Sequence, residues 1–236
     1  MVTSDEHEHE ARKSFDEHLA DIRSNVIRLA AVAGEMVEMS TEALLDAELP
    51  LVERVIESNG RLDQLQHEIE LETYEVFATQ QPMAIDLRTL LTVLRTLHEF
   101  ELTGDLTVSV AKAARRIYPD AIPPKIRGLL ERMGTQAGVQ LRAAVDAFAD
   151  NDLALALALP DMDDVMDDLQ KDLFRAIFSS CTPDEAGLQQ AVQIALVGRF
   201  YERIADHAVQ VGRWVNFMVT GEIPGYDALK SLDDSP

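Results

Sequence analysis

The 236-residue chain carries 42 acidic against 21 basic side chains, a formal net charge of −21 at pH 7. Such a surface repels phosphate backbones and anionic lipid head groups, which argues against a nucleic-acid partner. Cys181 is the only cysteine, which excludes an intrachain disulfide and a cysteine-rich zinc site and fits a reducing cytoplasm. The chain has no apolar stretch near the ~20 residues that span a bilayer, and its few aromatic residues favour helices over strands.

The first half of the chain is predicted to form three helices after an acidic, disordered tail at residues 1–14. Apolar residues recur at steps of three and four, which is typical of packed helices. Pro50 opens the second helix, Pro82 breaks the chain before the third, and Pro119 ends the third. The apolar stripes include Leu19, Ile22, Val26, Leu29, Ala33 and Met36, then Leu51, Val55, Leu62, Leu65, Ile69 and Val76, then Leu87, Leu90, Leu94, Leu97 and Val108.

The second half is predicted to form three more helices of roughly 30 residues each. Pro124 opens the fourth helix, and Pro160 should kink the fifth. The run Thr182-Pro183-Asp184-Glu185 predicts a capping box that opens the sixth, with Pro183 at its first position. Gly221 ends this helix, and residues 222–236 are a predicted C-terminal tail.

An internal duplication relates the two halves. A shift of 104 residues superimposes the first two helices on the fourth and fifth, and a shift of 101 aligns the third with the sixth. The matched pairs include Gly34 with Gly138, Asp63 with Asp167, Glu101 with Glu202, and Asp105 with Asp206. The sequence therefore predicts an all-α protein of two tandem, pseudo-symmetric three-helix bundles, over residues 15–118 and 119–221.

Carboxylates lie on the apolar stripes of both repeats. Glu101 and Asp105 are four residues apart, so they share one helix face with core residues, where their mutual repulsion calls for a proton or a cation. The neighbouring helix carries a second acidic pair in the second repeat, whereas the first repeat has Asn59 before Asp63. Oxygen ligands of this kind suit magnesium, manganese, calcium or iron. The predicted metal ligands are Asp63, Glu101 and Asp105 in the first repeat, and Asp163, Asp167, Glu202 and Asp206 in the second.

Two other interpretations stay open. The carboxylates are either surface residues of a purely structural helical adaptor, or part of a carboxylate-bridged, metal-dependent hydrolase or oxidase. A ferritin-like di-iron site needs Glu-x-x-His on two helices, and the chain lacks that motif outside its N-terminal tail. No P-loop, dinucleotide turn or nucleophile elbow is present, and Cys181 has no evident base partner. We therefore expect no catalytic residues.

Three segments resemble the PhoU family of phosphate-uptake regulators. They are Arg199–Val209 (RFYERIADHAV), Gln80–Arg88 (QQPMAIDLR) and Met218–Gly221 (MVTG), and the resemblance extends from about Phe15 to Gly221. It implies the duplicated three-helix fold and acidic metal clusters, with iron as the first candidate and magnesium, manganese or zinc as alternatives. Asn59 departs from the family pattern, so we expect a weaker first site.

The same resemblance implies a non-enzymatic, negative regulator. Its implied partners are the ATPase subunit of the phosphate ABC transporter and the phosphate-sensing histidine kinase, which it would meet at the cytoplasmic face of the membrane. A homodimer is also expected.

Overall fold

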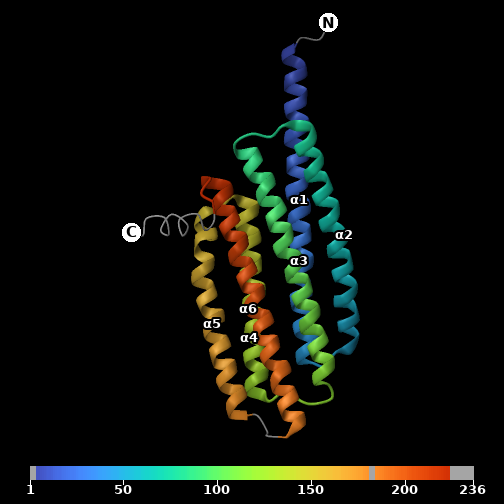
Figure 1. Ribbon diagram of the computed structural model, residues 1–236, viewed down its shortest axis with the longest axis vertical. Coiled ribbons are helices and arrows are strands. Elements are labelled where there is room, and N and C mark those ends of the chain that lie inside the picture. Colours follow the sequence, from blue (N-terminus) through green and yellow to red (C-terminus); the bar gives the residue numbers. More distant parts are fainter. Residues whose placement is uncertain (1–3, 181–183, 224–236) are drawn as a thin grey trace, which may run out of the picture.

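The computed structural model describes residues 4–180 and 184–223, which form six α-helices and no strand. The helices are α1 (Ser4–Leu45), α2 (Leu49–Gln80), α3 (Ile85–Ile117), α4 (Pro124–Asp150), α5 (Leu153–Ser180) and α6 (Glu185–Thr220) (Figure 1). The predicted all-α fold with six long helices is confirmed. No helix in these ranges combines the length and apolar character that crossing a membrane requires.

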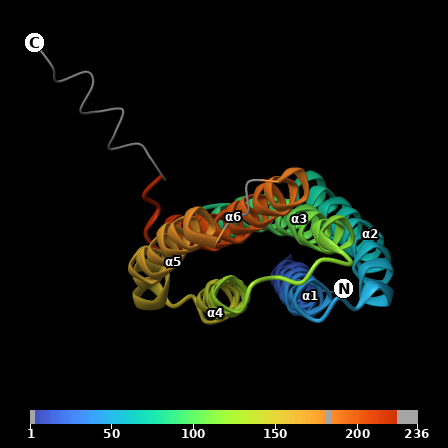
Figure 2. The same cartoon turned by 90° about the horizontal axis from the view of Figure 1, so that it is seen from below.

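The six helices pack in two layers. Seen along the bundle, α5, α6, α3 and α2 stand side by side in an arc, and α4 and α1 fill its inner side (Figure 2). The helix pairs in contact include α3 with α6 and α1 with α4, so the two repeats meet through both layers. Buried residues from all six helices form one continuous hydrophobic core. The repeats are therefore two halves of a single packed unit.

The contact between α1 and α4 repeats the same bond at both ends. Arg23 of α1 donates through Nη2 to the backbone oxygen of Ala149 at 3.0 Å, near the end of α4. Arg127 of α4, 104 residues later, donates to the backbone oxygen of Leu45, the last residue of α1. Each guanidinium thus satisfies a carbonyl that the end of a helix leaves unpaired. The duplication in the sequence appears here as a pseudo-twofold relation between the repeats.

Most predicted helix ends are confirmed. α2 has Pro50 in its first turn, α4 begins at Pro124, and Gly221 closes α6 with a φ of 85°, a left-handed conformation that glycine adopts freely. The start of α6 differs from the predicted capping box. The N-cap is Asp184, whose carboxylate accepts a hydrogen bond from the backbone N–H of Gly187 at 2.7 Å. Cys181, Thr182 and Pro183 lie outside the described residues.

The first helix begins earlier than the sequence suggests. Residues 4–14, which we expected in a disordered tail, are the first turns of α1. No glycine or proline interrupts the chain before Gly34, and an existing helix extends by one hydrogen bond for each residue added. Residues 1–3 of the predicted tail, and residues 224–236 of the C-terminal tail, lie outside the described residues.

Pro160 lies within α5, which continues unbroken from Leu153 to Ser180. Proline has no N–H, so the carbonyl of Ala156 lacks its usual helical partner. That carbonyl faces α6 at Gly212, where an added Cβ would come within 2.9 Å of the Ala156 oxygen. Glycine therefore allows the two backbones to approach at this point.

Candidate metal centres

The three predicted ligands of the first repeat lie together between α2 and α3. Asp63 belongs to α2, and Glu101 and Asp105 are one turn apart on α3. Burial raises the pKa of Asp63 above its usual value, and the negative charges of Asp105 and Glu101 raise it further. The structure thus brings these carboxylates close enough for their charges to interact.

Neutral side chains satisfy much of this first cluster. Asn59 donates through Nδ2 to Oδ1 of Asp105 at 3.3 Å, and Gln66 donates through Nε2 to Oε2 of Glu101 at 3.0 Å. His98 Nδ1 lies 3.4 Å from the same Glu101 oxygen. Amide donors therefore take up carboxylate oxygens that a cation would otherwise use.

The four predicted ligands of the second repeat lie between α5 and α6. Asp163 and Asp167 are on α5, and Glu202 and Asp206 are on α6. Burial raises the pKa of Asp163, the hydrogen bond from Gln140 Nε2 at 3.2 Å opposes that rise, and the charges of Asp206 and Asp167 add to it. This repeat therefore concentrates four carboxylates where the first repeat has three.

Glu202 is the least satisfied group of the second cluster. Its side chain is only 12% exposed, and burial followed by the charge of Asp206 raises its pKa, while an ion pair with Arg199 opposes the rise. Its Oε2 is buried without a hydrogen-bond partner among the described residues. The Nε2 of Gln170 is also buried and unpaired, although it stands 104 residues after Gln66, which bonds the matching glutamate in the first repeat. The second cluster thus keeps an unpaired carboxylate oxygen that suits a cation.

The predicted burial of the carboxylates is wrong for the majority of them. The carboxylates lie along the boundaries between neighbouring helices of the arc and not toward the core. The core contacts of α3 are made by other residues, which include Leu97, Phe100 and Thr103. The exposed carboxylates are Asp63, Asp105, Asp167 and Asp206, and the half-buried ones are Glu101, Asp163 and Glu202. Across residues 4–180 and 184–223, no three His, Cys, Asp or Glu side chains stand as a preformed metal-ligand group. An ion would have to draw the carboxylates together by rotation of their side chains.

Apart from Asn59, which the sequence already placed at the first cluster, the polar partners of these carboxylates were absent from our prediction. The partners are Asn59, Gln66 and Gln140, together with the cation Arg199. Gln140 had a readable signal in the sequence, because it stands at helical spacing from Met133, Ala137 and Ala144 on the apolar stripe of α4, and the structure buries it. Gln66 and Arg199 had none, since exposed or half-exposed polar residues are common on any helix.

His207 links the two repeats. Its Nδ1 lies 2.6 Å from Oε2 of Glu99, and both side chains are 13% exposed at the contact between α3 and α6. His207 is next to Asp206 in the sequence, but its side chain contacts the other repeat, which fits a structural role.

Comparisons with known proteins identify relatives along most of the chain. The family model described as "PhoU domain" matches twice, at residues 26–114 and 130–215. The chain is 33% identical over 221 residues to "Phosphate-specific transport system accessory protein PhoU homolog 1" of Mycobacterium tuberculosis, covering 93% of this chain and 99% of that protein. It is 30% identical over 211 residues to "Phosphate-specific transport system accessory protein PhoU homolog" of Caulobacter vibrioides, covering 89% of this chain and 91% of that protein.

Solved structures agree in fold. The crystal structure of PhoU from Pseudomonas aeruginosa superimposes with a TM-score of 0.83 at 27% identity, covering 88% of this chain and 100% of that one. The phosphate transport system regulatory protein PhoU from Streptococcus pneumoniae gives a TM-score of 0.81 at 22% identity, which supports the fold alone.

Proposed function

Because the chain belongs to the PhoU family, we propose that it is a non-catalytic accessory regulator of phosphate transport. The observation that carries this proposal is end-to-end similarity to proteins named as accessories of the phosphate-specific transport system, with the PhoU domain matched in both halves. A body of long helices fits an accessory role, since helix faces serve as docking surfaces for other proteins.

The proposed partners are the ATPase subunit of a phosphate ABC transporter and a phosphate-sensing histidine kinase, both met at the cytoplasmic face of the membrane. We propose that the chain restrains both when phosphate is plentiful. Deletion of its gene in the host should derepress phosphate-starvation genes in phosphate-rich medium. Normal repression in a strain without a second copy of the gene would refute the assignment.

A homodimer is part of this proposal. Leu188, Val192 and Leu196 recur every four residues along α6 and are all exposed, and Phe178 on α5 is 85% exposed. Exposed apolar stripes of this kind are typical of protein interfaces. Sedimentation equilibrium of the full chain measures the state, and a monomer at micromolar concentration would remove this part of the proposal.

We also propose that the second carboxylate cluster binds a metal ion, with iron first and magnesium, manganese or zinc as alternatives. Asp163, Asp167, Glu202 and Asp206 would hold it, and the ion would supply positive charge that offsets their repulsion. The unpaired buried oxygen of Glu202 supports this choice. In the first repeat Asp63, Glu101 and Asp105 would form a weaker site, because Asn59 and Gln66 already donate to two of the carboxylates.

Elemental analysis of protein purified without a metal-affinity step tests the metal proposal. The double variant Glu202→Ala, Asp206→Ala should lose more metal than Asp63→Ala. Equal losses would contradict the ranking of the two sites. If the parent protein holds no metal even after incubation with each ion in turn, that result would contradict metal binding itself.

A further inference from the structure

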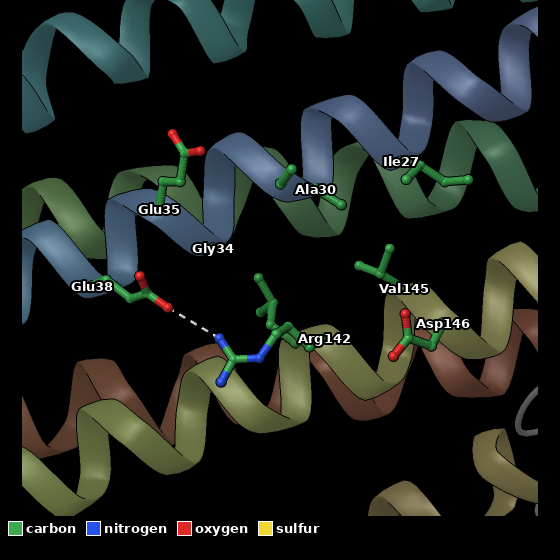
Figure 3. Close-up of a pocket in the computed structure, with 10 residues that line it drawn as sticks. Ile27, Ala30, Gly34, Glu35, Glu38, Arg142, Val145 and Asp146 are labelled. Carbon is green, nitrogen blue, oxygen red and sulfur yellow. Dashed lines mark hydrogen bonds and ion pairs between the residues drawn. The ribbon is translucent and has the colours of Figure 1, made fainter.

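A groove follows the seam between α1 and α4, on helices that carry none of the predicted metal ligands. One cavity of about 280 Å³ and a second of about 320 Å³ lie along it, and both are lined by α1 and α4, with Asp46 directly after α1 added in the second. The two cavities share Glu38 and Arg142, which reach toward each other across the gap and form an ion pair at 3.1 Å (Figure 3). The cavities are therefore two stretches of one groove, crossed by a single ion pair.

The first stretch has an apolar floor. Ile27 and Ala30 of α1 and Leu141 and Val145 of α4 line it, and Ile27 is 37% exposed. Gly34 keeps the middle of this stretch open, because a Cβ added there would meet no atom within 4 Å. An apolar surface left open in this way gains free energy when a partner covers it.

The rim of the groove is strongly anionic. Among its lining residues Arg142 is the only cation, and Glu38 already neutralises it. Four lining carboxylates form no ion pair with any residue that the structure describes. They are Glu35, Glu42, Glu131 and Asp146. The groove therefore combines an apolar floor with uncompensated negative charge on both walls.

These properties select one kind of ligand. The lining residues of α1 extend from Ile27 to Leu45, about 20 residues or ~30 Å of helix, and two helices alone leave the groove open along its length. An elongated ligand with an apolar stripe and flanking cations matches both the shape and the charge. We propose that the α1–α4 groove binds a basic amphipathic α-helix of a partner protein. This inference rests on the proposed function for the premise that the chain acts by docking.

Two synthetic helices of about 20 residues test the groove directly. Both carry leucine at helical spacing, and their other positions are lysine in one peptide and glutamate in the other. The full chain should bind the lysine peptide and not the glutamate peptide, as followed by fluorescence anisotropy. Hydrogen exchange with the lysine peptide present should slow at residues 27–38 and 141–146.

Gly34→Leu fills the open stretch of the groove and should raise the Kd for the lysine peptide about tenfold or more, because the leucine stripe of the peptide can no longer pack against the apolar floor. Gly60→Leu is the matched control. Gly60 also lies in a helix with no atom within 4 Å of an added Cβ, but it is on α2 and should leave the Kd unchanged. Ala31→Leu, at an exposed position of the same groove, should act like Gly34→Leu if the glycine variant fails to fold.

Three outcomes would overturn the proposal. Equal affinities for the Gly34→Leu and Gly60→Leu proteins would mean that the peptide binds the general negative surface. Unchanged hydrogen exchange along the groove would mean the same. A parent dimer that Gly34→Leu converts to monomer would make the groove an interface between two copies of the chain. The gene deletion tests the regulatory role separately, because it can fail while the groove binds the peptide, and the reverse.

Discussion

Replacing Glu202 with glutamine should change stability in opposite directions with and without metal. In the parent protein, the negative charge of Glu202 is largely buried beside Asp206, and one of its oxygens has no hydrogen-bond partner among the described residues. Glu202→Gln removes this charge from the metal-free protein. It keeps the shape of the side chain, so packing against α5 should persist. We therefore expect the metal-free variant to be more stable than the parent.

The magnitude follows from the charges. Two carboxylates one turn apart, at ~6 Å, repel by ~3 kcal/mol at an effective dielectric of about 20. Asp206 is exposed, so screening by water reduces this to about 1–2 kcal/mol. Loss of the Arg199 ion pair, whose cation is 54% exposed, costs about 0.5 kcal/mol. The net gain is about 1 kcal/mol, or a rise in Tm of roughly 2–4 °C for a chain of this size.

Saturating metal should reverse the order. An ion at about 100 times its Kd stabilises the parent by about 2.7 kcal/mol, and a variant without one of its ligands loses most of this. Urea denaturation in chelator, and again with Fe²⁺ under anaerobic conditions, Mg²⁺ or Mn²⁺, measures both signs. Glu101→Gln is the matched control in the first repeat, where Gln66 already bonds the carboxylate, and we expect a smaller change. A metal-free Glu202→Gln protein less stable than the parent would refute the reasoning, because it would show that Arg199 outweighs burial and repulsion.

Three further predictions concern the apparatus around the site. Arg23→Ala should cost about 2 kcal/mol in urea denaturation and Arg127→Ala about 1 kcal/mol. Arg23 bonds two carbonyls at the end of α4 and the side chain of Asn151, whereas Arg127 bonds one carbonyl and the exposed Asp46; equal costs would contradict this. Gly212→Ala should lower the free energy of unfolding by about 1–3 kcal/mol, because its Cβ would come within 2.9 Å of the Ala156 oxygen. Gly34→Ala should raise it by about 0.5–1 kcal/mol, because its Cβ meets no atom within 4 Å and alanine favours the helix. A change of the same sign in both variants would contradict the packing described above. Asp63, Asp163 and Glu202 have raised pKa values in the fold, so at these groups the folded protein binds more protons than the unfolded chain. The contribution of these groups to stability is present near pH 4 and is lost as the pH rises through the raised values. The Tm of the metal-free protein should therefore increase as the pH falls from neutral toward the ordinary carboxyl range at about 4.5, and saturating metal should reduce that dependence; a metal-free Tm that falls throughout this range would contradict it.

Local features of the sequence determined the helices. Apolar spacing of three and four marks a continuous helix face, and proline and glycine mark where helices start and stop. The two shifts, of 104 and 101 residues, likewise predicted the duplication, because equivalent helices need the same apolar faces and the same ends. The N-terminal turns were harder to predict, since a polar run without glycine or proline is compatible with either a tail or the extension of an existing helix.

Only the tertiary structure decided which faces meet. A helical stripe specifies that a face is covered but not by what. The sequence therefore placed Glu101 and Glu202 on covered faces and could not name Gln66 and Arg199 as their partners. The groove at Gly34 has the same origin. A glycine in a helix reads as a close contact until the neighbouring helix is placed, and here α4 passes at a distance that leaves the space open. Such properties depend on packing between residues more than 100 positions apart, and periodicity along one helix carries no record of that packing.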